Sequence, residues 1–376
     1  MKTLILSKKD IREIATHIDI HQLMDEMITR LMSAFESYDA TKINIPVRDG
    51  FQYTHPTVGL VEWMPAMTVG GRVAVKTVGY HPTNPKQHNL PTILSTTSVY
   101  DTQTGHLIGI VDATFLTALR TGAASAIASK FMANPASKII GLIGAGAQAV
   151  TQLHALSRNF SIEKVFVYDI DAKISNDFLK RIDFMGFNVD QVVVTSLETL
   201  LEMSDIICTQ TSVDIGKGPV FNDFKTKPWL HINAVGADFP GKVELPLSLL
   251  KGSFVCPDFR EQAIKEGECQ QLSAPEIGPN LFELVQNAKQ YNNLPEQRTV
   301  FDSTGWALED LVAVEMLMEM AAELNIGTSI QIESISAAPQ NPYEFILSES
   351  EETYLDTEYL GFDTKRVQND ADKRTN

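Results

Sequence analysis

The stretch that decides the fold is Ile140-Gly141-Leu142-Ile143-Gly144-Ala145-Gly146-Ala147-Gln148-Ala149. It is a short apolar strand that ends in glycines and opens into a helical pattern. Gly144 permits a tight turn, Gly146 lets the backbone approach a pyrophosphate, and Ala149 is small enough for close helix–strand packing. The helix N-terminus, at Ala147 and Gln148, offers unpaired N–H groups to phosphates. The stretch therefore predicts a dinucleotide site, and the alternative is a glycine-rich loop without a ligand.

An acidic residue at the end of the next strand indicates which dinucleotide binds. The apolar run Val165–Tyr168 ends at Asp169, twenty residues after Ala149. A carboxylate at this position accepts hydrogen bonds from the ribose hydroxyls and repels a 2′-phosphate. The sequence therefore predicts NAD rather than NADP as the cofactor.

Strands and helices alternate around this turn, which predicts a doubly wound, Rossmann-type parallel sheet. A long apolar helix over 311–324 is expected to cross back to the first domain. The expected strands are 138–143, 165–168, 192–195, 206–209 and 231–235, and the expected helices are 117–132, 148–157, 174–184 and 197–203.

The first 116 residues have a different pattern, which predicts an α+β domain. A helix is expected from Ile20 to Phe35 with Asp19 as its N-cap, and residues 101–105 are expected to form a hairpin turn. The strands expected here are 59–64, 72–77, 92–100 and 106–111. We predict a substrate-binding and dimerisation domain from 1–116 and 321–347, an NAD-binding domain over 117–320, and a flexible acidic tail at 348–376.

Composition excludes several classes of protein. The chain has 376 residues, 44% of them hydrophobic, and a formal net charge of −16. Such an acidic chain is a poor partner for nucleic acid or for anionic membranes, and no stretch approaches the roughly 18 to 20 apolar residues of a membrane span. Its three cysteines stand apart, with no Cys/His cluster, so we expect neither disulfides nor a metal site. These features predict a cytoplasmic enzyme.

Hydride chemistry on an amino acid needs cations for a carboxylate and a group that moves protons. Lys76 lies in an apolar strand, Arg120 in an Ala-rich helix, and Arg48 in a loop. The alternative for Lys76 is a solvated strand face, and for each arginine a structural salt bridge. Asp238 follows the expected strand 231–235, where doubly wound sheets place their chemistry, but it could equally serve a turn or a helix cap.

A set of short motifs carries a family resemblance. They are Val61-Glu62-Trp63-Met64-Pro65, Lys76 with Gly79-Tyr80-His81-Pro82, Asn89-Leu90-Pro91-Thr92, Thr117-Ala118-Leu119-Arg120-Thr121, Asn233-Ala234-Val235-Gly236-Ala237-Asp238-Phe239-Pro240-Gly241-Lys242, Glu266-Gly267-Glu268-Cys269-Gln270-Gln271-Leu272 and Phe301-Asp302-Ser303-Thr304-Gly305-Trp306-Ala307-Leu308-Glu309-Asp310. Together with the glycine turn, they resemble the ornithine cyclodeaminase/mu-crystallin family over residues 5–346, and the bacterial cyclodeaminases most of all.

The resemblance implies an NAD-dependent, homodimeric ornithine cyclodeaminase of proline biosynthesis. In such an enzyme Cα of L-ornithine is oxidised, the distal amine attacks the imine, ammonia leaves, and reduction of the ring gives L-proline. The family assigns the substrate carboxylate to Arg48, Lys76 and Arg120, the amino groups to Glu62, and general acid/base catalysis to Asp238, with Lys76 as a second catalytic residue. Its cofactor contacts map to Thr92, Arg120, Thr121, Asn233, Val235 and Ser303, besides the glycine turn and Asp169.

Other activities stay open on the sequence alone. One extra methylene changes binding by only about 1–3 kcal/mol, so a lysine cyclodeaminase that forms L-pipecolate is one alternative. A net NAD-dependent amino-acid dehydrogenase or imine reductase of the same family is a second. A protein that binds the ligand without catalysis is a third, although both Lys76 and Asp238 are present.

Overall fold

The structure of the chain is a computed structural model that describes residues 1–347. Met1–Ile330 form one compact unit with two β-sheets, and a second unit begins at Gln331. The described part of the second unit contains the short helix α13 (Glu344–Leu347). The predicted acidic tail lies outside the described residues.

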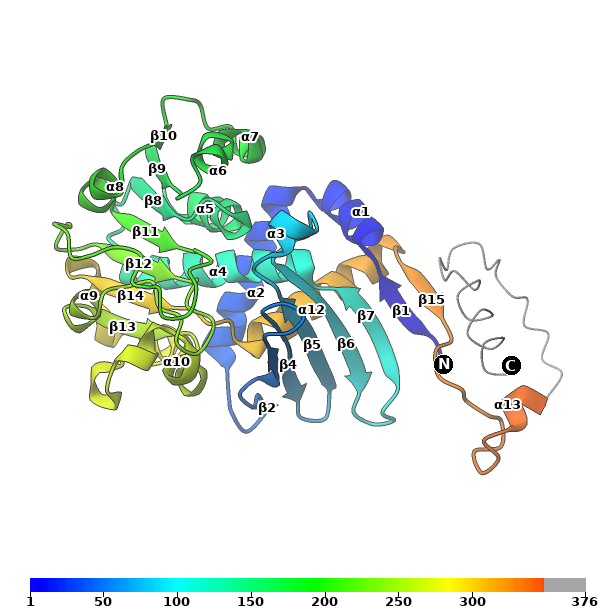
Figure 1. Cartoon of the computed structure of the whole chain (residues 1–376). Helices are drawn as coiled ribbons and strands as arrows, with labels where there is room; N and C mark the ends of the chain where they lie inside the picture. The colour runs from blue at the N-terminus through cyan, green and yellow to red at the C-terminus, as the bar shows by residue number, and fades with distance from the viewer. Residues whose placement is uncertain (348–376) are drawn as a thin grey trace, which may run out of the picture. The chain divides into compact units, whose positions relative to one another are not determined.

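The first sheet has eight strands in the order β15-β1-β7-β6-β5-β4-β2, with β3 paired to β4 (Figure 1). Only the β1–β7 pair is parallel among the pairs of this sheet. The strands are β1 (Thr3–Leu6), β2 (Ile43–Asn44), β3 (Asp49–Tyr53), β4 (Gly59–Thr68), β5 (Arg72–Tyr80), β6 (Ile93–Asp101), β7 (Leu107–Asp112) and β15 (Thr328–Ile330).

Two charged residues share the covered face of this sheet with apolar side chains. In the antiparallel register Met64 lies opposite Lys76, and Glu62 lies opposite Val78. Because side chains alternate along a strand, Glu62 and Lys76 project to the same face. The buried neighbours on that face are Leu60, Met64, Ala66, Ala74 and Val78.

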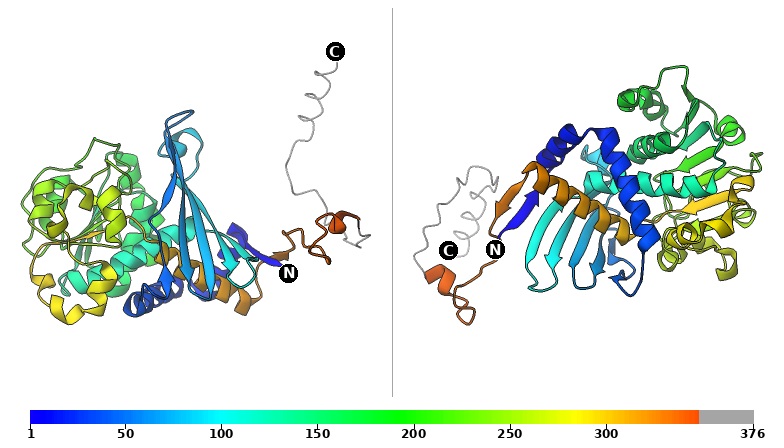
Figure 2. Two further views of the ribbon diagram at one scale, coloured as in Figure 1. Left: turned by 90° about the horizontal axis from the view of Figure 1, so that it is seen from below. Right: turned by 180° about the vertical axis from the view of Figure 1, so that it is seen from behind.

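Three helices cover this face: α1 (Lys8–Ile18), α2 (Ile20–Ser37) and α12 (Ala307–Leu324). They lie on one side of the sheet when the molecule is seen from behind (Figure 2). Asp19 caps α2 as predicted, because its Oδ1 accepts hydrogen bonds from the backbone N–H groups of His21 and Gln22, at 2.8 and 3.4 Å.

The second sheet has seven strands, all parallel, in the order β10-β9-β8-β11-β12-β14-β13. From β8 the chain adds strands toward one edge of the sheet, and from β11 it adds them toward the other edge. This change in strand order is typical of the doubly wound fold, and ligands bind at the carboxyl ends of the strands where it occurs. The strands are β8 (Ile139–Ile143), β9 (Lys164–Tyr168), β10 (Val192–Val194), β11 (Ile206–Thr209), β12 (His231–Ala234), β13 (Phe254–Pro257) and β14 (Thr299–Asp302).

Two buried helices join the sheets. The helix α4 (Thr114–Met132) leads from β7 to β8, and α12 leads from β14 back to β15. Both contribute to a hydrophobic core that includes Leu119, Ala123, Leu311 and Leu317. The other helices of the second sheet are α5 (Ala147–Asn159), α6 (Ala172–Asn176), α7 (Phe178–Arg181), α8 (Leu197–Met203), α9 (Leu247–Lys251), α10 (Arg260–Glu266) and α11 (Leu281–Gln286), and the short α3 (Asn84–Gln87) follows β5.

The structure confirms the predicted fold class, and it changes details of the elements. The expected helix 174–184 is wrong, because the chain there breaks into α6, α7 and a 3-10 turn. α12 begins four residues before the expected 311, and α4 begins three residues before the expected 117, which places Arg120 in the second turn of α4. The domain boundaries stay a prediction. No helix among residues 1–347 has the length and apolarity needed to cross a bilayer.

Candidate active site

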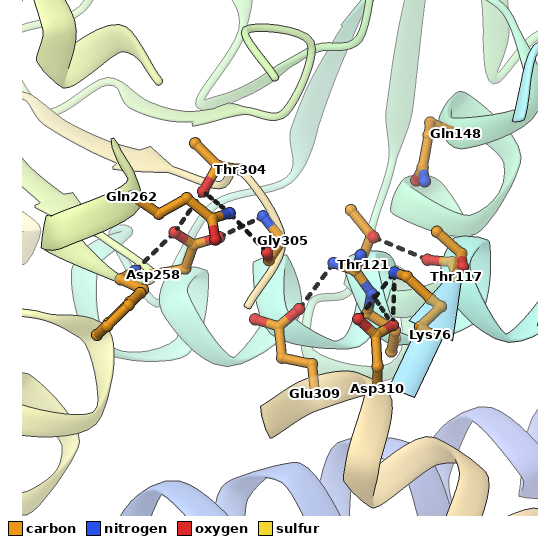
Figure 3. Close-up of polar contacts among 12 residues, drawn as sticks. Lys76, Thr117, Thr121, Gln148, Asp258, Gln262, Thr304, Gly305, Glu309 and Asp310 are labelled. Carbon is orange, nitrogen blue, oxygen red and sulfur yellow. Dashed lines mark hydrogen bonds and ion pairs between the residues drawn. The ribbon is translucent and has the colours of Figure 1, made fainter. Parts of the chain in front are cut away.

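Lys76 lies in a buried group of four charged side chains from β5, α4 and the first turn of α12 (Figure 3). Its Nζ atom is 2.8 Å from Asp310 Oδ1 and 2.7 Å from Asp310 Oδ2. Arg120 donates from Nε to Asp310 Oδ1 at 3.2 Å and from Nη1 to Glu309 Oε2 at 2.8 Å. None of the four residues is more than 6% exposed. Lys76 and Arg120, two of the three cations predicted to hold the substrate carboxylate, therefore share Asp310 as a partner.

Burial controls the protonation of this group. Desolvation lowers the pKa of Lys76 to about 8, although Asp310 opposes the shift. Desolvation likewise raises the pKa of Glu309 to about 8, against the attraction of Arg120. At pH values below about 8, Glu309 is therefore protonated, and the two cations face the single negative charge of Asp310. The group then has one positive charge in excess, which a substrate carboxylate can neutralise.

The loop after β14 supports Arg120 from the other side. Gly305 has a φ of +90°, and a Cβ added there would lie 2.6 Å from Arg120 Nη2. Its N–H donates to Asp258 Oδ2 at 2.6 Å, and Thr304 Oγ1 donates to Asp258 Oδ1 at 3.2 Å (Figure 3). Burial raises the pKa of Asp258. Only glycine fits between this carboxylate and the guanidinium.

A second group of charges surrounds Arg48. Its Nη1 donates to the Thr304 carbonyl at 3.1 Å and its Nη2 to the Asp238 carbonyl at 2.9 Å. Its Nε lies 2.6 Å from Glu266 Oε1 and 3.4 Å from Glu62 Oε2. Arg48, Glu62 and Glu266 line a cavity of about 150 Å³. Arg48 therefore joins the two sheets and holds carboxylates at a cavity.

Asp238 follows β12, at the carboxyl edge of the parallel sheet. Its Oδ1 is 2.9 Å from Lys242 Nζ, and the buried Lys242 also lies over the ring of Tyr80, 5.2 Å from its centre. Among residues 1–347, Oδ2 of Asp238 has no hydrogen-bond partner, and the side chain is 26% exposed. This oxygen is free to exchange a proton with a ligand.

The glycine turn has the geometry that a dinucleotide needs. Gly144 has a φ of +88°, and a Cβ added at Gly146 would meet no atom within 4 Å. α5 begins directly after this open space, at Ala147. Asp169 Oδ2 accepts a hydrogen bond from Ala145 N at 2.8 Å, so the acidic residue lies against the turn. These residues fit the pyrophosphate and ribose of NAD.

The other predicted cofactor residues differ in their surroundings. Ser303 Oγ is buried without a hydrogen-bond partner among the described residues, which suits a residue that awaits a ligand. Thr121 Oγ1 is bonded to the Thr117 carbonyl within α4 (Figure 3). Asn233 is fully buried, and its Nδ2 donates to Ser129 Oγ at 2.9 Å. Its burial does not support the predicted contact with NAD.

Three more predicted positions lie at the ends of elements. Val235 follows β12, Thr92 precedes β6, and Gln148 lies in the first turn of α5. The Thr92 carbonyl accepts a hydrogen bond from His81 N at 2.8 Å, and Gln148 Oε1 accepts one from Thr151 Oγ1 at 3.2 Å. Their contacts with a cofactor stay predictions.

The buried charges decide between the alternatives left open by the sequence. A solvated strand face for Lys76 is wrong, because the residue is 1% exposed. Both arginines form the buried ion pairs that were their alternative roles, so their contact with substrate stays a prediction. Sequence reasoning assigned no role to Glu266, Glu309 or Asp310, although two adjacent carboxylates beside the apolar helix 311–324 were a signal of buried charge.

The parallel sheet, the glycine turn and the buried charges at its carboxyl edge define a nicotinamide-dependent enzyme of small amino acids. The profile of the ornithine cyclodeaminase/mu-crystallin family matches residues 8–325, and the chain belongs to this family. It is 39% identical to the L-lysine cyclodeaminase of Streptomyces rapamycinicus over 91% of this chain and 99% of that enzyme. It is 31% identical to the ornithine cyclodeaminase of Agrobacterium tumefaciens over 78% of this chain and 81% of that enzyme.

Solved structures give the same result. A lysine cyclodeaminase described with L-lysine, L-ornithine and L-2,4-diaminobutyric acid superimposes with a TM-score of 0.88 and 42% identity, over 92% of this chain and all of that one. An archaeal alanine dehydrogenase, a dimer with bound NAD, superimposes with a TM-score of 0.79 and 31% identity, over 89% of this chain and all of that one. The family is NAD-dependent, and NAD is the cofactor.

Proposed function

We propose that this protein is an NAD-dependent cyclodeaminase that converts L-lysine to L-pipecolate and ammonia, with L-ornithine as a second substrate that gives L-proline. The observation that carries the proposal is the similarity to lysine cyclodeaminase, which has higher identity and coverage than the similarity to the ornithine enzyme. The sequence predicted L-ornithine as the substrate and L-lysine as the alternative, and this proposal puts L-lysine first.

The residues of the site suit this chemistry. Lys76 and Arg120 orient the substrate carboxylate, and Glu309, with a pKa near 8, stays protonated at neutral pH and leaves the group one positive charge for that carboxylate. NAD, when bound, accepts a hydride from Cα and returns it to the cyclic imine. Asp238 accepts the proton of the distal amine through its free Oδ2 and returns it to the departing ammonia. Nucleophile and electrophile belong to one bound molecule, which favours ring closure.

A net amino-acid dehydrogenase is the second candidate, favoured by the 32% identity to the alanine dehydrogenase of Archaeoglobus fulgidus over 88% of this chain and 99% of that enzyme. The two activities differ in their electron balance. A cyclodeaminase regenerates NAD in every turnover, whereas a dehydrogenase leaves one NADH for each imine that it forms.

The test incubates the protein with substoichiometric NAD and either L-lysine or L-ornithine. Ammonia, pipecolate, proline and NADH are then quantified. We expect ammonia and pipecolate in large excess over the added NAD, with lysine the better substrate. Accumulation of NADH equal to the substrate consumed would contradict the proposal in favour of the dehydrogenase, and proline as the dominant product would restore ornithine as the main substrate.

We also propose a cytoplasmic homodimer. The dimeric archaeal relative supports the dimer. The absence of disulfides among the three buried cysteines is in keeping with a reducing compartment. Sedimentation of the purified protein tests the oligomeric state, and a monomer at micromolar concentration would refute it.

A further inference from the structure

Two carboxylates at the Arg48 cavity lack the hydrogen bonds that buried carboxylates normally have. Glu62 is 7% exposed and Glu266 is 6% exposed. Glu266 Oε1 and Glu62 Oε2 both pair with Arg48 Nε, at 2.6 and 3.4 Å. Within residues 1–347, no backbone N–H and no side chain other than Arg48 donates to either carboxylate, which leaves acceptor sites unused. Buried carboxylates usually have several donors.

Other buried carboxylates of this protein accept hydrogen bonds from backbone N–H groups. Asp302 accepts hydrogen bonds from two backbone N–H groups, those of Glu268 and Cys269, at 2.9 and 2.7 Å. Glu244 accepts them from Thr211 and Gly236, at 2.6 and 3.0 Å. These carboxylates are structural. Glu62 and Glu266 lie at a cavity instead and have no such donors.

The charges at this cavity do not balance. Arg48 is the cation that contacts both glutamates, and its two Nη atoms already donate to backbone carbonyls. Asp49 and Lys265 also line the cavity, so three carboxylates and two cations meet there and one negative charge is in excess. The ion pair formed by Asp238 and Lys242 is neutral as a unit. Burial first, and then the charges of Glu62 and Asp238, raise the pKa of Glu266 to about 7 despite Arg48.

We propose that Glu266 joins Glu62, to which the family resemblance assigns the substrate's amino groups, in binding the distal ammonium group, and that Glu266 thereby selects diamino acids over monoamino acids. An ammonium group has three N–H donors and one positive charge. It would therefore supply the hydrogen-bond donors that the two carboxylates lack and neutralise the excess negative charge. The two glutamates line a cavity of about 150 Å³, which has room for the end of a side chain. The inference rests on the proposed function, because it assigns the α-carboxylate to Lys76 and Arg120.

The position of Glu266 agrees with this role. Glu266 is the last residue of α10, a helix that follows β13 of the second sheet, whereas Glu62 lies on β4 of the first sheet. The two carboxylates therefore approach the cavity from different halves of the molecule. The charge of Asp238 acts on both glutamates, so the general acid/base of the proposed function lies in the same part of the site. Recognition of the distal nitrogen and its deprotonation then occur at neighbouring groups.

The test measures binding without turnover. Protein loaded with NADH cannot accept a hydride, so the affinity for a ligand can be measured by calorimetry. The two ligands are L-lysine and L-norleucine, which has the carbon skeleton of lysine without the ε-amine. The variants are Glu266→Gln and, as a matched control, Glu261→Gln, an exposed carboxylate in the first turn of the same helix.

We expect the unaltered protein to bind lysine more tightly than norleucine. Glu266→Gln should weaken lysine binding by about 10- to 100-fold, the usual value of a hydrogen bond to a charged group, and should leave norleucine binding within about twofold. Glu261→Gln should change neither. Equal affinity of the unaltered protein for both ligands, or an equal loss of both in Glu266→Gln, would overturn the proposal.

Two further outcomes are informative. If Glu266→Gln no longer binds NADH, Glu266→Asp replaces it; this variant keeps the charge but withdraws it by one methylene, and it should weaken lysine binding selectively by a smaller factor. Unchanged lysine binding in Glu266→Asp would then refute the role. Failure of the proposed function has a different signature, because a protein that prefers lysine over norleucine but releases no ammonia from it retains the ammonium site without being a cyclodeaminase.

Discussion

Lys76 Nζ lies 2.8 Å from Asp310 Oδ1, and the two residues are 234 positions apart in the chain. Lys76 belongs to the first sheet, whereas Asp310 begins the helix that returns from the second sheet. Their side chains are 1% and 6% exposed. The charge of Lys76, on the first sheet, is therefore balanced by α12, a helix that follows the last strand of the second sheet.

Removing the charge of Asp310 should destabilise the protein strongly. Asp310→Asn removes the carboxylate that Lys76 Nζ contacts and leaves Arg120 with Glu309 as its remaining ion-pair partner. Breaking one side of a buried ion pair typically costs about 3–5 kcal/mol. We expect a decrease of this size in the free energy of unfolding, measured by urea denaturation. Glu315→Gln is the control on the same helix, since its half-exposed pair with Arg72 at 3.7 Å should contribute less than about 1 kcal/mol. Equal losses in both variants would contradict this account.

Gly305→Ala should damage the site through backbone strain and a steric clash. The residue has a φ of +90°, and its new Cβ would approach Arg120 Nη2 to 2.6 Å. Gly105→Ala is the control, because Gly105 has a φ of +77° but no atom within 4 Å of an added Cβ. We expect about 1 kcal/mol of destabilisation from the positive φ alone in Gly105→Ala and clearly more in Gly305→Ala, together with a lower kcat. Thermal unfolding and steady-state kinetics check both, and similar losses in the two variants would rule out the contact with Arg120.

Asp238→Asn should abolish ammonia release while NAD still binds. Asparagine keeps the shape of the side chain but cannot take up the proton that Asp238 Oδ2 is free to accept. A decrease of at least about 100-fold in kcat is expected from loss of general acid/base catalysis. Fluorescence titration measures NAD binding, and Asp214→Asn, an exposed acid of a nearby loop, is the control. Full activity in Asp238→Asn would remove this residue from the mechanism.

Stability should fall as the pH rises from about 6.5 to 8. Burial raises the pKa of Glu266 and Asp302 to about 7 and that of Glu309 to about 8, from ordinary values of 4.5, 3.8 and 4.5. In this window the folded state binds protons that the unfolded state has released, so raising the pH favours unfolding, by roughly 1 kcal/mol per pH unit for each such proton.

Two kinds of shifted group act in the opposite direction at the edges of this window. The pKa of Lys76, lowered by burial to about 8, makes stability rise with pH from about 8 upwards, because the folded state then releases a proton that the unfolded state keeps. The pKa values of His154 and His231 are lowered by burial to about 4 and about 3, and they make stability rise with pH below about 6.5. Urea denaturation at several pH values measures the slope. Glu266→Gln should make it shallower between pH 6.5 and 8, whereas Glu261→Gln should not. An unchanged slope in Glu266→Gln would mean that this carboxyl does not titrate in the window.

The sequence predicted much of the site. The glycine turn, Asp169 and Asp238 could be located because each follows an apolar strand, and the carboxyl ends of parallel strands meet at one edge of a sheet. Lys76 stood out as a charge in an apolar strand, whereas Glu62 could be assigned only through the family resemblance. Glu266 could not be assigned in this way, because it ends a short helix and its neighbours in sequence include the exposed Lys265.

The sequence by itself determined the fold class, the NAD site and the family, because these depend on short-range patterns: a glycine spacing, a strand–helix alternation and contiguous motifs. Only the tertiary structure decided which charges meet. Asp310 reaches Lys76, and Glu266 reaches Arg48, across the boundary between the two sheets. The free energy of a buried charge depends on the partners and the water around it in space, and residues that lie more than 200 positions apart in the chain leave no local pattern that reveals such a pair.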